Sequence, residues 1–448
     1  MSVLMTQHHA VYEDSGIEWL GAKPAHWALA RIKEVAYINA KTLPDNTAPD
    51  YEFDYVDIGS VTYGVSGYTS EKMSFRDAPS RAKRIVRNGD TIVSTVRTYL
   101  KAVTQIGVAD NLIVSTGFAV LSPHKLVDGS FFSKWLMSDV FISQVSAISK
   151  GVSYPATNAT EIGNLFIFLP PISEQAGIAA YLDAKTKQID RKIDLLTKKA
   201  EKYGALKKSL ITETVMRGLD KTVPLKESGI EWFGQVPAHW KFKRLKELAS
   251  IQNSNVDKKS DENEISVRLC NYVDVYKNEF IDSRLAKSFM WATADVAEVL
   301  KFGIKKNDVL ITKDSETADD IAVPALVTET LDGVLCGYHL AQIKTNTKLL
   351  LGAYLFRLFQ SESYGHRFEI SAKGITRVGL GQSAIADAMT PIPSLEEQMS
   401  IAAYLNERTK IIDDIVQKIN GQIKNLNDLR KSLINDVVTG KIKVVSEG

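Results

Sequence analysis

The stretch GIEWLGAKPAHW at residues 16–27 recurs as GIEWFGQVPAHW at residues 229–240, with nine of twelve positions identical. A second pair, EQAGIAAYLDAKTKQID at 174–190 and EQMSIAAYLNERTKIID at 397–413, shares eleven of seventeen positions. The first pair is offset by 213 residues and the second by 223, so the second copy has gained about ten residues in between. The chain is therefore an internal repeat, A–B–A′–B′, in which the centres of A and A′ have diverged.

The A segments, which we place at residues 1–172 and 220–394, show mixed secondary-structure signals. Short β-branched runs such as 91–94 and 309–312 predict strands, and apolar residues at helical spacing in 131–142 and 350–359 predict short helices. We therefore predict an α+β globule for each A segment.

The B segments, placed at 173–219 and 395–448, predict one long amphipathic helix each, over 174–218 and 397–440. Tyr203-Gly204 is a candidate interruption of the first helix, and Ser394 to Glu397 has the pattern of a capping box at the start of the second. A narrow apolar stripe needs a partner helix, and the obvious partner is the other copy. The stripe residues are Ile178, Leu182, Ile189, Ile193, Leu196, Tyr203, Leu206 and Leu210, then Ile401, Leu405, Ile412, Ile415, Ile419, Leu426, Leu429 and Leu433.

The predicted fold class is therefore α+β, with two globular mixed α/β domains joined by two long antiparallel helices. These helices form a coiled-coil-like spacer that holds the domains at opposite ends, and the molecule has an internal pseudo-two-fold repeat. Two similar readers at a fixed separation match a duplex with two half-sites. Nearly identical ends would bind the same partner twice, because symmetry displays the same surface twice.

The overall composition is that of a soluble globular chain, with 44% hydrophobic and 24% charged residues. The charges nearly cancel, at 55 Lys and Arg against 53 Asp and Glu, so any surface for nucleic acid must be local. Only Cys270 and Cys336 occur, which is too few for a disulfide framework and predicts a reducing, cytoplasmic setting. No apolar run approaches the ~18–20 residues of a membrane span.

Local basic stretches predict DNA binding. Residues 72–101 contain eight basic and two acidic residues, and 185–208 contain nine basic and three acidic residues. Both stretches are suited to phosphate contact, and a solvated surface is the alternative for each single lysine. Arg, Lys, Asn and aromatic side chains are those that reach base edges. The candidates for DNA contact are Arg81, Lys83, Arg84, Arg97, Tyr99, Lys101, Lys150, Tyr154 and Asn158 in the first half, and Asn271, Tyr272, Lys313, Lys373 and Arg377 in the second.

No catalytic residue is predicted. The Asp/Asn-Pro-Pro-Tyr/Phe tetrapeptide of amino-methyltransferases and a phosphate-binding loop are both missing from the sequence. His26 and His239 recur beside a tryptophan, but no second ligand or carboxylate partner at a matching position is evident, so no metal site is predicted. The repeated entry motif is instead interpreted as a packed element or a docking surface.

Taken together, these motifs carry a family resemblance. The entry motif is followed in each half by PPISEQ at 170–175 or PSLEEQ at 393–398, then by IAAYL and KSLI. This combination resembles the specificity (S) subunit of type I restriction-modification systems, over essentially the full length. The resemblance implies two target-recognition domains joined by two long helices.

The resemblance also implies the partners and the division of labour. Such a subunit binds double-stranded DNA and two modification subunits, which carry S-adenosylmethionine and methylate adenine N6. Restriction subunits add ATP-dependent translocation and cleavage. The S chain itself is not an enzyme and binds no cofactor, since S-adenosylmethionine, ATP and Mg²⁺ belong to the partners. Subunit contact is assigned to the entry motifs and helix starts, represented by Trp19, Trp27, Glu174, Gln175, Tyr181, Trp232, Trp240, Glu397, Gln398 and Tyr404.

Two other classes of function remain. A stand-alone sequence-specific DNA-binding regulator would also use two half-site readers on a rod. It would not need near-identical helical and entry surfaces beyond its own dimer contact. A single-chain enzyme that both recognises and modifies DNA ranks last, because it would need the missing methyltransferase or nuclease motifs.

Overall fold

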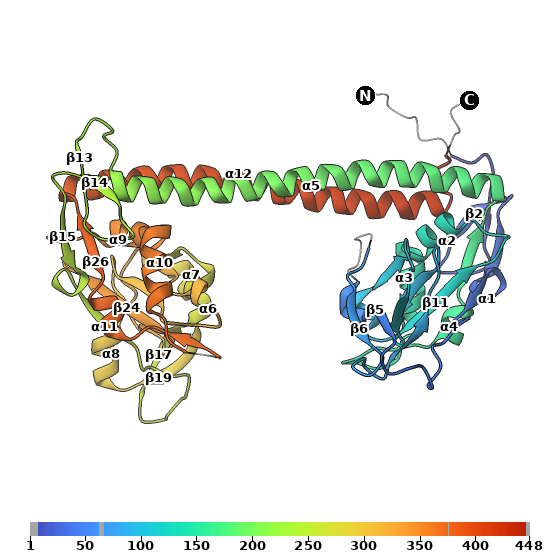
Figure 1. The fold of residues 1–448 in the computed structure, drawn as a ribbon, viewed down its shortest axis with the longest axis horizontal. Helices are drawn as coiled ribbons and strands as arrows, with labels where there is room; N and C mark the ends of the chain where they lie inside the picture. The colour runs from blue at the N-terminus through green and yellow to red at the C-terminus, as the bar shows by residue number, and fades with distance from the viewer. Residues whose placement is uncertain (1–7, 62–66, 375, 445–448) are drawn as a thin grey trace. The chain divides into compact units, whose positions relative to one another are not determined.

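The computed structural model describes residues 8–61, 67–374 and 376–444, which belong to two compact units (Figure 1). Unit 1 comprises the chain up to residue 197 together with residues from 420 onward, and unit 2 comprises residues 198–419. The long helices α5 (Ile172–Arg217) and α12 (Leu395–Val438) each contribute one half to each unit. Each unit therefore consists of one α+β globule and two helix halves.

Unit 1 contains two four-stranded sheets, ordered β6-β5-β10-β7 and β4-β11-β8-β9, and the pairs β1-β2 and β12-β3. In chain order its elements are β1 (Tyr12–Asp14), β2 (Ala22–Pro24), β3 (Ala28–Arg31), α1 (Ile32–Val35), β4 (Ala36–Ile38), β5 (Glu52–Val56), η1 (Ile58–Ser60), β6 (Glu71–Ser74), β7 (Ala82–Ile85), β8 (Thr91–Ser94), η2 (Thr98–Leu100), β9 (Val103–Gln105), β10 (Leu112–Ser115), β11 (Phe118–Pro123), α2 (Gly129–Leu136), α3 (Asp139–Ile148), α4 (Ala159–Gly163) and β12 (Phe166–Leu169).

Unit 2 contains a five-stranded sheet, β16-β24-β20-β22-β18, a three-stranded sheet, β19-β17-β23, and the pairs β13-β14, β15-β26 and β21-β25. Its elements are β13 (Leu225–Glu227), β14 (Gln235–Pro237), β15 (Lys241–Arg244), η3 (Leu245–Glu247), β16 (Ala249–Asn253), β17 (Ile265–Cys270), α6 (Tyr272–Lys277), β18 (Phe280–Ile281), α7 (Ser283–Ala286), β19 (Met290–Ala294), α8 (Val296–Phe302), β20 (Val309–Thr312), β21 (Asp314–Ser315), η4 (Ala318–Asp320), β22 (Pro324–Val327), β23 (Val334–Cys336), β24 (Leu340–Thr345), α9 (Gly352–Phe359), α10 (Glu362–Ser371), β25 (Val378–Gly379), α11 (Gln382–Ala386) and β26 (Met389–Ile392).

The strand registers confirm the internal repeat. The entry motif forms part of a hairpin in both units, with Tyr12 opposite Pro24 in β1–β2 and Leu225 opposite Pro237 in β13–β14. The strand after it pairs antiparallel with the strand before the long helix, as β3–β12 in unit 1 and β15–β26 in unit 2. The conserved ends of each copy therefore fold together into one base, from which the divergent centre projects.

The divergent centres contain the predicted strands and helices. The runs 91–94 and 309–312 are β8 and β20, and all eight residues are buried. The apolar stretch 131–142 belongs to two short helices, α2 and α3, and Ser138 starts α3 by accepting a hydrogen bond from the Phe141 N–H. The stretch 350–359 contains the single helix α9.

The long helices begin two residues earlier than predicted, and α5 continues through Tyr203-Gly204 without a break. The predicted capping box is confirmed: the Ser394 N–H donates to Glu397 Oε2 (3.0 Å), and the Glu397 N–H donates to Ser394 Oγ (3.2 Å). An ordinary helical glycine costs only about 1 kcal/mol, which 46 residues of helix tolerate.

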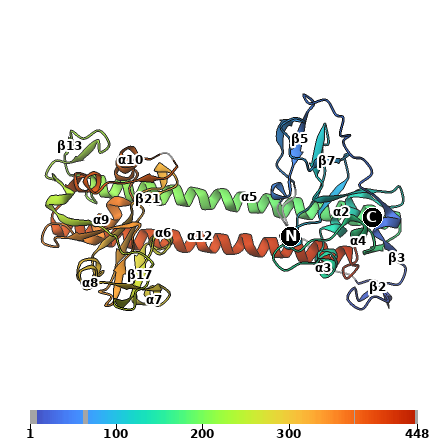
Figure 2. The same cartoon turned by 90° about the horizontal axis from the view of Figure 1, so that it is seen from below.

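Within each unit the two helix halves lie side by side and run antiparallel (Figure 2). In unit 2, Lys207 of α5 lies 2.8 Å from Asp413 of α12, and in unit 1, Arg430 of α12 lies 3.5 Å from Asp190 of α5. These four residues are equivalent in the repeat, so the same contact occurs twice with the helices exchanged. The repeat therefore extends to the polar contacts between the two helices within each unit.

These basic residues also correct the predicted apolar stripe. Leu206 and Leu429 are exposed, at 52% and 55%, although both were placed in the stripe. Their neighbours Lys207 and Arg430 turn inward instead, with side chains only 18% and 7% exposed, because each has an aspartate on the facing helix. A basic side chain that has an acidic partner on the facing helix therefore occupies the helix–helix contact, and the leucine next to it in the sequence faces solvent.

In each globule a basic residue contacts a long helix. In unit 2, Arg357 of α9 is 1% exposed and donates to Asn406 Oδ1 (2.7 Å) and Thr409 Oγ1 (3.0 Å) of α12. In unit 1, Lys134 of α2 lies 2.9 Å from Asp183 of α5. Both views show α2 against the long helices in unit 1 (Figure 1, Figure 2).

Among the described residues, no helix combines the length and apolar character that crossing a bilayer requires. Cys270 and Cys336 are both free and buried, and burial raises the pKa of each thiol.

Candidate nucleic-acid interface and subunit-contact surface

Two loops that are distant in sequence meet in unit 1. One follows β8 (residues 95–101) and the other follows α3 (residues 149–157). Their backbones pair directly: the Thr98 N–H donates to the Pro155 carbonyl (3.2 Å), and the Thr157 N–H donates to the Thr95 carbonyl (2.8 Å). We call these two segments the unit 1 loop pair.

The unit 1 loop pair brings five predicted DNA-contact residues together, namely Arg97, Tyr99, Lys101, Lys150 and Tyr154. The Arg97 guanidinium lies over the Tyr154 ring, 5.4 Å from its centroid. Tyr99 and Tyr154 are 54% and 67% exposed. The two segments carry three basic residues and no acidic residue. The pair therefore presents an exposed basic and aromatic surface.

The backbone of this surface is strained. Arg97 and Lys101 flank η2 with φ values of +51° and +52°, in the left-handed region that side chains other than glycine rarely adopt. Such strain costs about 1–3 kcal/mol per residue and concentrates at functional loops. The cross-loop hydrogen bonds hold these two basic residues in that conformation.

The other unit 1 candidates have structural partners. The Asn158 side chain caps α4 by accepting from the Glu161 N–H (2.9 Å). Lys83 lies 2.7 Å from Asp45, and Arg84 donates to Thr42 Oγ1 (3.1 Å), so their side chains are engaged along β7. Arg81, by contrast, is exposed. The structure thus separates the β7 group from the unit 1 loop pair.

In unit 2 the equivalent loop pair consists of residues 313–320, which follow β20, and of the described residues 372–374 and 376–380, which follow α10. The segments join through β21–β25 and through the Leu380 N–H, which donates to the Lys313 carbonyl (2.8 Å). Lys373 and Arg377 are exposed on the second segment. The Lys313 ammonium lies 4.8 Å from the centroid of Tyr338, which is 50% exposed and which sequence reasoning missed as a site residue. The only sequence signal for Tyr338 was its place beside Gly337, matching Gly117-Phe118.

Tyr272 and Asn271 lie beside the unit 2 loop pair. Tyr272 stacks on Tyr276 with ring centroids 5.5 Å apart, and burial raises the pKa of Tyr272, partly offset by its hydrogen bond to Ser315 and by the charge of Arg377. The Asn271 side chain donates to the Leu269 carbonyl (3.2 Å) at the start of α6. Segment 313–320 holds four acidic residues and one basic residue, so this pair is not basic overall, unlike that of unit 1.

The basic stretch of α5 is mostly exposed. Lys187, Arg191, Lys192, Lys199 and Lys202 all face solvent. Lys185 and Lys207 are half-buried: Lys185 lies over the Tyr181 ring, and Lys207 pairs with Glu279 as well as with Asp413.

Four of the predicted subunit-contact side chains are buried, which corrects their assignment. Trp27 and Trp240 are at most 1% exposed, and so are Gln175 and Gln398. Gln175 accepts from the Asp128 N–H (2.8 Å), and Gln398 accepts from the Leu351 N–H (2.8 Å). These side chains pin the long helices to the start of α2 and α9, so they cannot contact another subunit directly.

The remaining subunit-contact candidates reach the surface. Trp19 is 55% exposed. Tyr181, Trp232 and Tyr404 are half-buried, each beneath a cation, namely Lys185, Arg367 and Arg408. Exposed apolar side chains also begin both long helices, Ile172 at 55% and Leu395 at 37%.

Glu174 and Glu397 supply the carboxylate partners that the sequence did not reveal. His26 Nε2 lies 3.0 Å from Glu174 Oε2, and His239 Nε2 lies 2.8 Å from Glu397 Oε1. The missed signal was that histidine and glutamate recur together in both copies, about 150 residues apart. Burial raises the pKa of Glu397, but hydrogen bonds from His239, Ser394 and Trp240 outweigh it and hold that pKa below its ordinary value.

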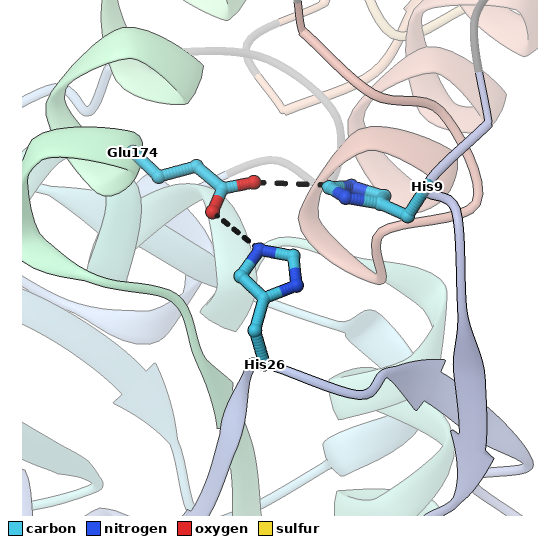
Figure 3. A group of neighbouring side chains, drawn as sticks. All are labelled: His9, His26 and Glu174. Carbon is cyan, nitrogen blue, oxygen red and sulfur yellow. Dashed lines mark hydrogen bonds and ion pairs between the residues drawn. The ribbon is translucent and has the colours of Figure 1, made fainter.

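Unit 1 adds a second histidine to this pair (Figure 3). His9 Nε2 lies 3.8 Å from Glu174 Oε1, and its side chain is only 4% exposed. Burial lowers the pKa of His9, with Glu174 acting in the opposite direction. The ligand atoms of His9, His26 and Glu174 all lie within 4.8 Å of one another, so the structure supplies the partner ligands for His26 that the sequence did not indicate.

A comparison with known protein families matches the two copies of the repeat separately. A family model described as "Type I restriction modification DNA specificity domain" matches residues 24–202 and 237–425. The MjaVIII specificity subunit of a type I restriction enzyme from Methanocaldococcus jannaschii is 22% identical over 341 residues, covering 74% of this chain and 75% of the relative. The StySPI specificity subunit from Salmonella potsdam is 20% identical and covers 94% of this chain and 90% of the relative.

One solved structure shares the fold over nearly the full length. It belongs to a study of complex assembly and conformational transition of the type I R-M system, and its matching chain superposes with a TM-score of 0.69 at 20% identity. The match covers 93% of this chain and 98% of that chain.

Proposed function

Because this chain belongs to the family of type I restriction-modification DNA specificity domains, we propose that each of its units reads one half of a two-part, asymmetric DNA target. Its function is DNA sequence recognition in such a system. The observation that carries the proposal is the loop pair, which occurs at equivalent places in both units with different residues. Because the loop pairs lie at equivalent positions, each unit can approach a duplex in the same way. Because their residues differ, each unit can prefer different bases.

The chemistry of the loop pairs suits base reading beside phosphate contact. An arginine held in one conformation presents the fork that pairs with guanine O6 and N7. In unit 1, Arg97 is held by its strained backbone and by the Tyr154 ring. In unit 2, Lys373 and Arg377 are exposed on the segment equivalent to that of Lys150 and Tyr154, and Lys313 lies against Tyr338. Phosphate attraction would be stronger at unit 1, where the two segments contain no acidic residue, although the Glu161 carboxylate lies 3.7 Å from Lys150.

The partner subunits bind, in this proposal, to surfaces that occur twice. Ile172 and Leu395 begin the two long helices as exposed apolar residues, and Leu206 and Leu429 are exposed at equivalent positions farther along. Repeated surfaces fit two copies of one partner, which we assign as two modification subunits that methylate adenine N6. These carry S-adenosylmethionine, and restriction subunits carry ATP and Mg²⁺, while this chain supplies sequence choice without chemistry. The helices set the gap between the two half-sites.

The test is selection of bound duplexes from a random library, using this chain purified with its co-encoded modification subunit. We expect a two-part asymmetric motif with a fixed unspecified gap. A contiguous single motif, or equal selection by this chain without the modification subunit, would instead favour a stand-alone DNA-binding regulator.

Exchanging residues 13–172 for the corresponding segment of another family member is expected to change one half-site and leave the other intact. The reason is that the loop pair of unit 2 lies entirely within residues 198–419. The same selection assay measures the outcome. If both half-sites changed together, the two units would not read independently.

Replacing Arg97 by alanine is expected to relax selection at one position of a single half-site. Loss of one paired base contact corresponds to about 1–3 kcal/mol, or roughly 5- to 150-fold in affinity for the preferred base. Binding titrations at several salt concentrations distinguish this from a phosphate contact, which would weaken all sequences alike and reduce the salt slope by about one. Arg87→Ala is the matched control, because Arg87 is exposed in the same basic stretch but precedes β8.

A further inference from the structure

We propose that His9, His26 and Glu174 form a binding site for a divalent transition metal of the zinc class. His26 Nε2 and Glu174 Oε2 are 3.0 Å apart, and His9 Nε2 and Glu174 Oε1 are 3.8 Å apart. Ligands at ~2.0–2.2 Å from a tetrahedral zinc ion lie about 3.3–3.5 Å from one another, so the two distances bracket the required spacing. Figure 3 shows both rings turned toward the two carboxylate oxygens. Imidazole with carboxylate is a donor set that zinc accepts.

The second unit serves as an internal reference for this arrangement. There, the indole N–H of Trp240 donates to Glu397 Oε1 (3.2 Å), beside the bond between Glu397 and His239. In unit 1, the equivalent indole N–H of Trp27 is buried and has no hydrogen-bond partner among the described residues. Unlike Glu397 in unit 2, Glu174 makes no hydrogen bond to the tryptophan and faces the two histidines instead. A buried donor without a partner is unfavourable, so the orientation of Glu174 toward the two histidines has a cost that unit 2 does not carry.

The third ligand is specific to unit 1. The Ala25 N–H donates to the Val11 carbonyl (3.1 Å), and the Ala238 N–H donates to the Pro224 carbonyl (2.8 Å), which aligns these two segments residue for residue. Two positions earlier, His9 corresponds to Thr222. Unit 2 therefore has the histidine and glutamate but no imidazole in the third place.

The site opens on a hollow of about 590 Å³, which Lys443 and Val444 also line. The positive charge of Lys443 would repel a metal ion, but this side chain is exposed to solvent. Glu174 supplies one negative charge that attracts the ion. Three protein ligands and an open side leave a fourth position for water or another small ligand, as in zinc sites that are not purely structural.

A metal at this place would fasten the N-terminal segment to the start of α5. That segment already contacts the residues that follow α12, because Tyr12 Oη donates to the Gly440 carbonyl (2.8 Å) and a His8 ring nitrogen lies 3.0 Å from the Lys441 carbonyl oxygen. Through His9, a bound metal ion would link this N-terminal segment to α5 as well.

The experiment uses the full chain carrying no histidine tag, stripped with a chelator and then dialysed against ZnCl₂. The number of zinc ions per chain is measured by inductively coupled plasma mass spectrometry. We expect one zinc ion per chain for the wild type, and loss of that ion in His9→Ala, His26→Ala and Glu174→Gln. His8→Ala and His239→Ala are the matched controls and should each keep the ion.

Two further measurements separate loss of the site from loss of the fold. In EDTA, the three ligand variants should melt at the wild-type temperature, and added zinc should raise the melting temperature of the wild type and the controls alone. Cobalt(II) should give the strong visible absorption of a tetrahedral site in the wild type and not in the ligand variants. No zinc bound to the wild type, equal zinc in all variants, or loss caused by His8→Ala and not by His9→Ala would each overturn the proposal.

Discussion

Replacing Arg357 by alanine is expected to destabilise unit 2 by about 3–5 kcal/mol, the cost of breaking a buried charged network by removing one member. The guanidinium is 1% exposed and donates to Asn406, Thr409 and Gln360. Burial lowers the pKa of Arg357, while the nearby Glu279 acts in the opposite direction. Alanine would leave these acceptors without a donor and open a cavity where α9 meets α12.

Hydrogen exchange read by mass spectrometry is the suitable measurement, because the two units need not unfold together. Peptides from α9 and from the first half of α12 should exchange faster, while peptides from α2 and α3 in unit 1 should keep their protection. Arg357→Met is the matched variant. It retains most of the volume and should cost less, since a packed apolar replacement often compensates for a buried charge. An alanine variant with unchanged protection in α9 would show that this network does not hold the globule to the helix.

Replacing Gly374 by alanine is expected to weaken DNA binding roughly tenfold or more and to blur the half-site that unit 2 reads. Gly374 has a φ of +140°, and a Cβ there would lie 1.9 Å from the Arg377 carbonyl oxygen. The backbone must move, which displaces Lys373 and Arg377 from the unit 2 loop pair. Gly151 holds the equivalent turn in unit 1, with a φ of +104°.

The matched control is Gly365→Ala in α10, where an added Cβ meets nothing within 4 Å and alanine favours the helix. Affinity for the selected duplex and for duplexes altered in one half-site gives the readout. Gly374→Ala should lose discrimination at one half-site only. If it discriminated like the wild type, the loop at 372–380 would have no part in base reading.

Much of the architecture could be predicted from the repeated sequence motifs alone. Two copies of one motif indicate one fold used twice, and paired stripes at helical spacing indicate two helices that pack on each other. The resemblance to type I specificity subunits, drawn from the same motifs, is confirmed by the family model over both copies. Errors arose where a side chain's environment depended on the facing helix, as when Lys207 and Arg430 took the places expected for Leu206 and Leu429.

The candidate site was less accessible to prediction. The basic and aromatic residues of the unit 1 loop pair could be selected by type, but their meeting depends on backbone bonds between segments some fifty residues apart. Tyr338 was missed because its one sequence signal, the match of Gly337-Tyr338 to Gly117-Phe118, does not show that the ring is exposed beside Lys313. Trp27 and Gln175 were misassigned because a motif repeated for packing has the same letters as one repeated for docking.

The repeat, the two α+β globules, the long antiparallel helices and the family can all be predicted from the sequence, because periodicity and repetition are properties of the chain. The folded structure was needed to show which repeated residues face inward, which loops meet, and that His9 joins His26 and Glu174. Such contacts join residues that are far apart along the chain. A contact between residues 9 and 174 is created by packing and has no local energy that a sequence pattern could record.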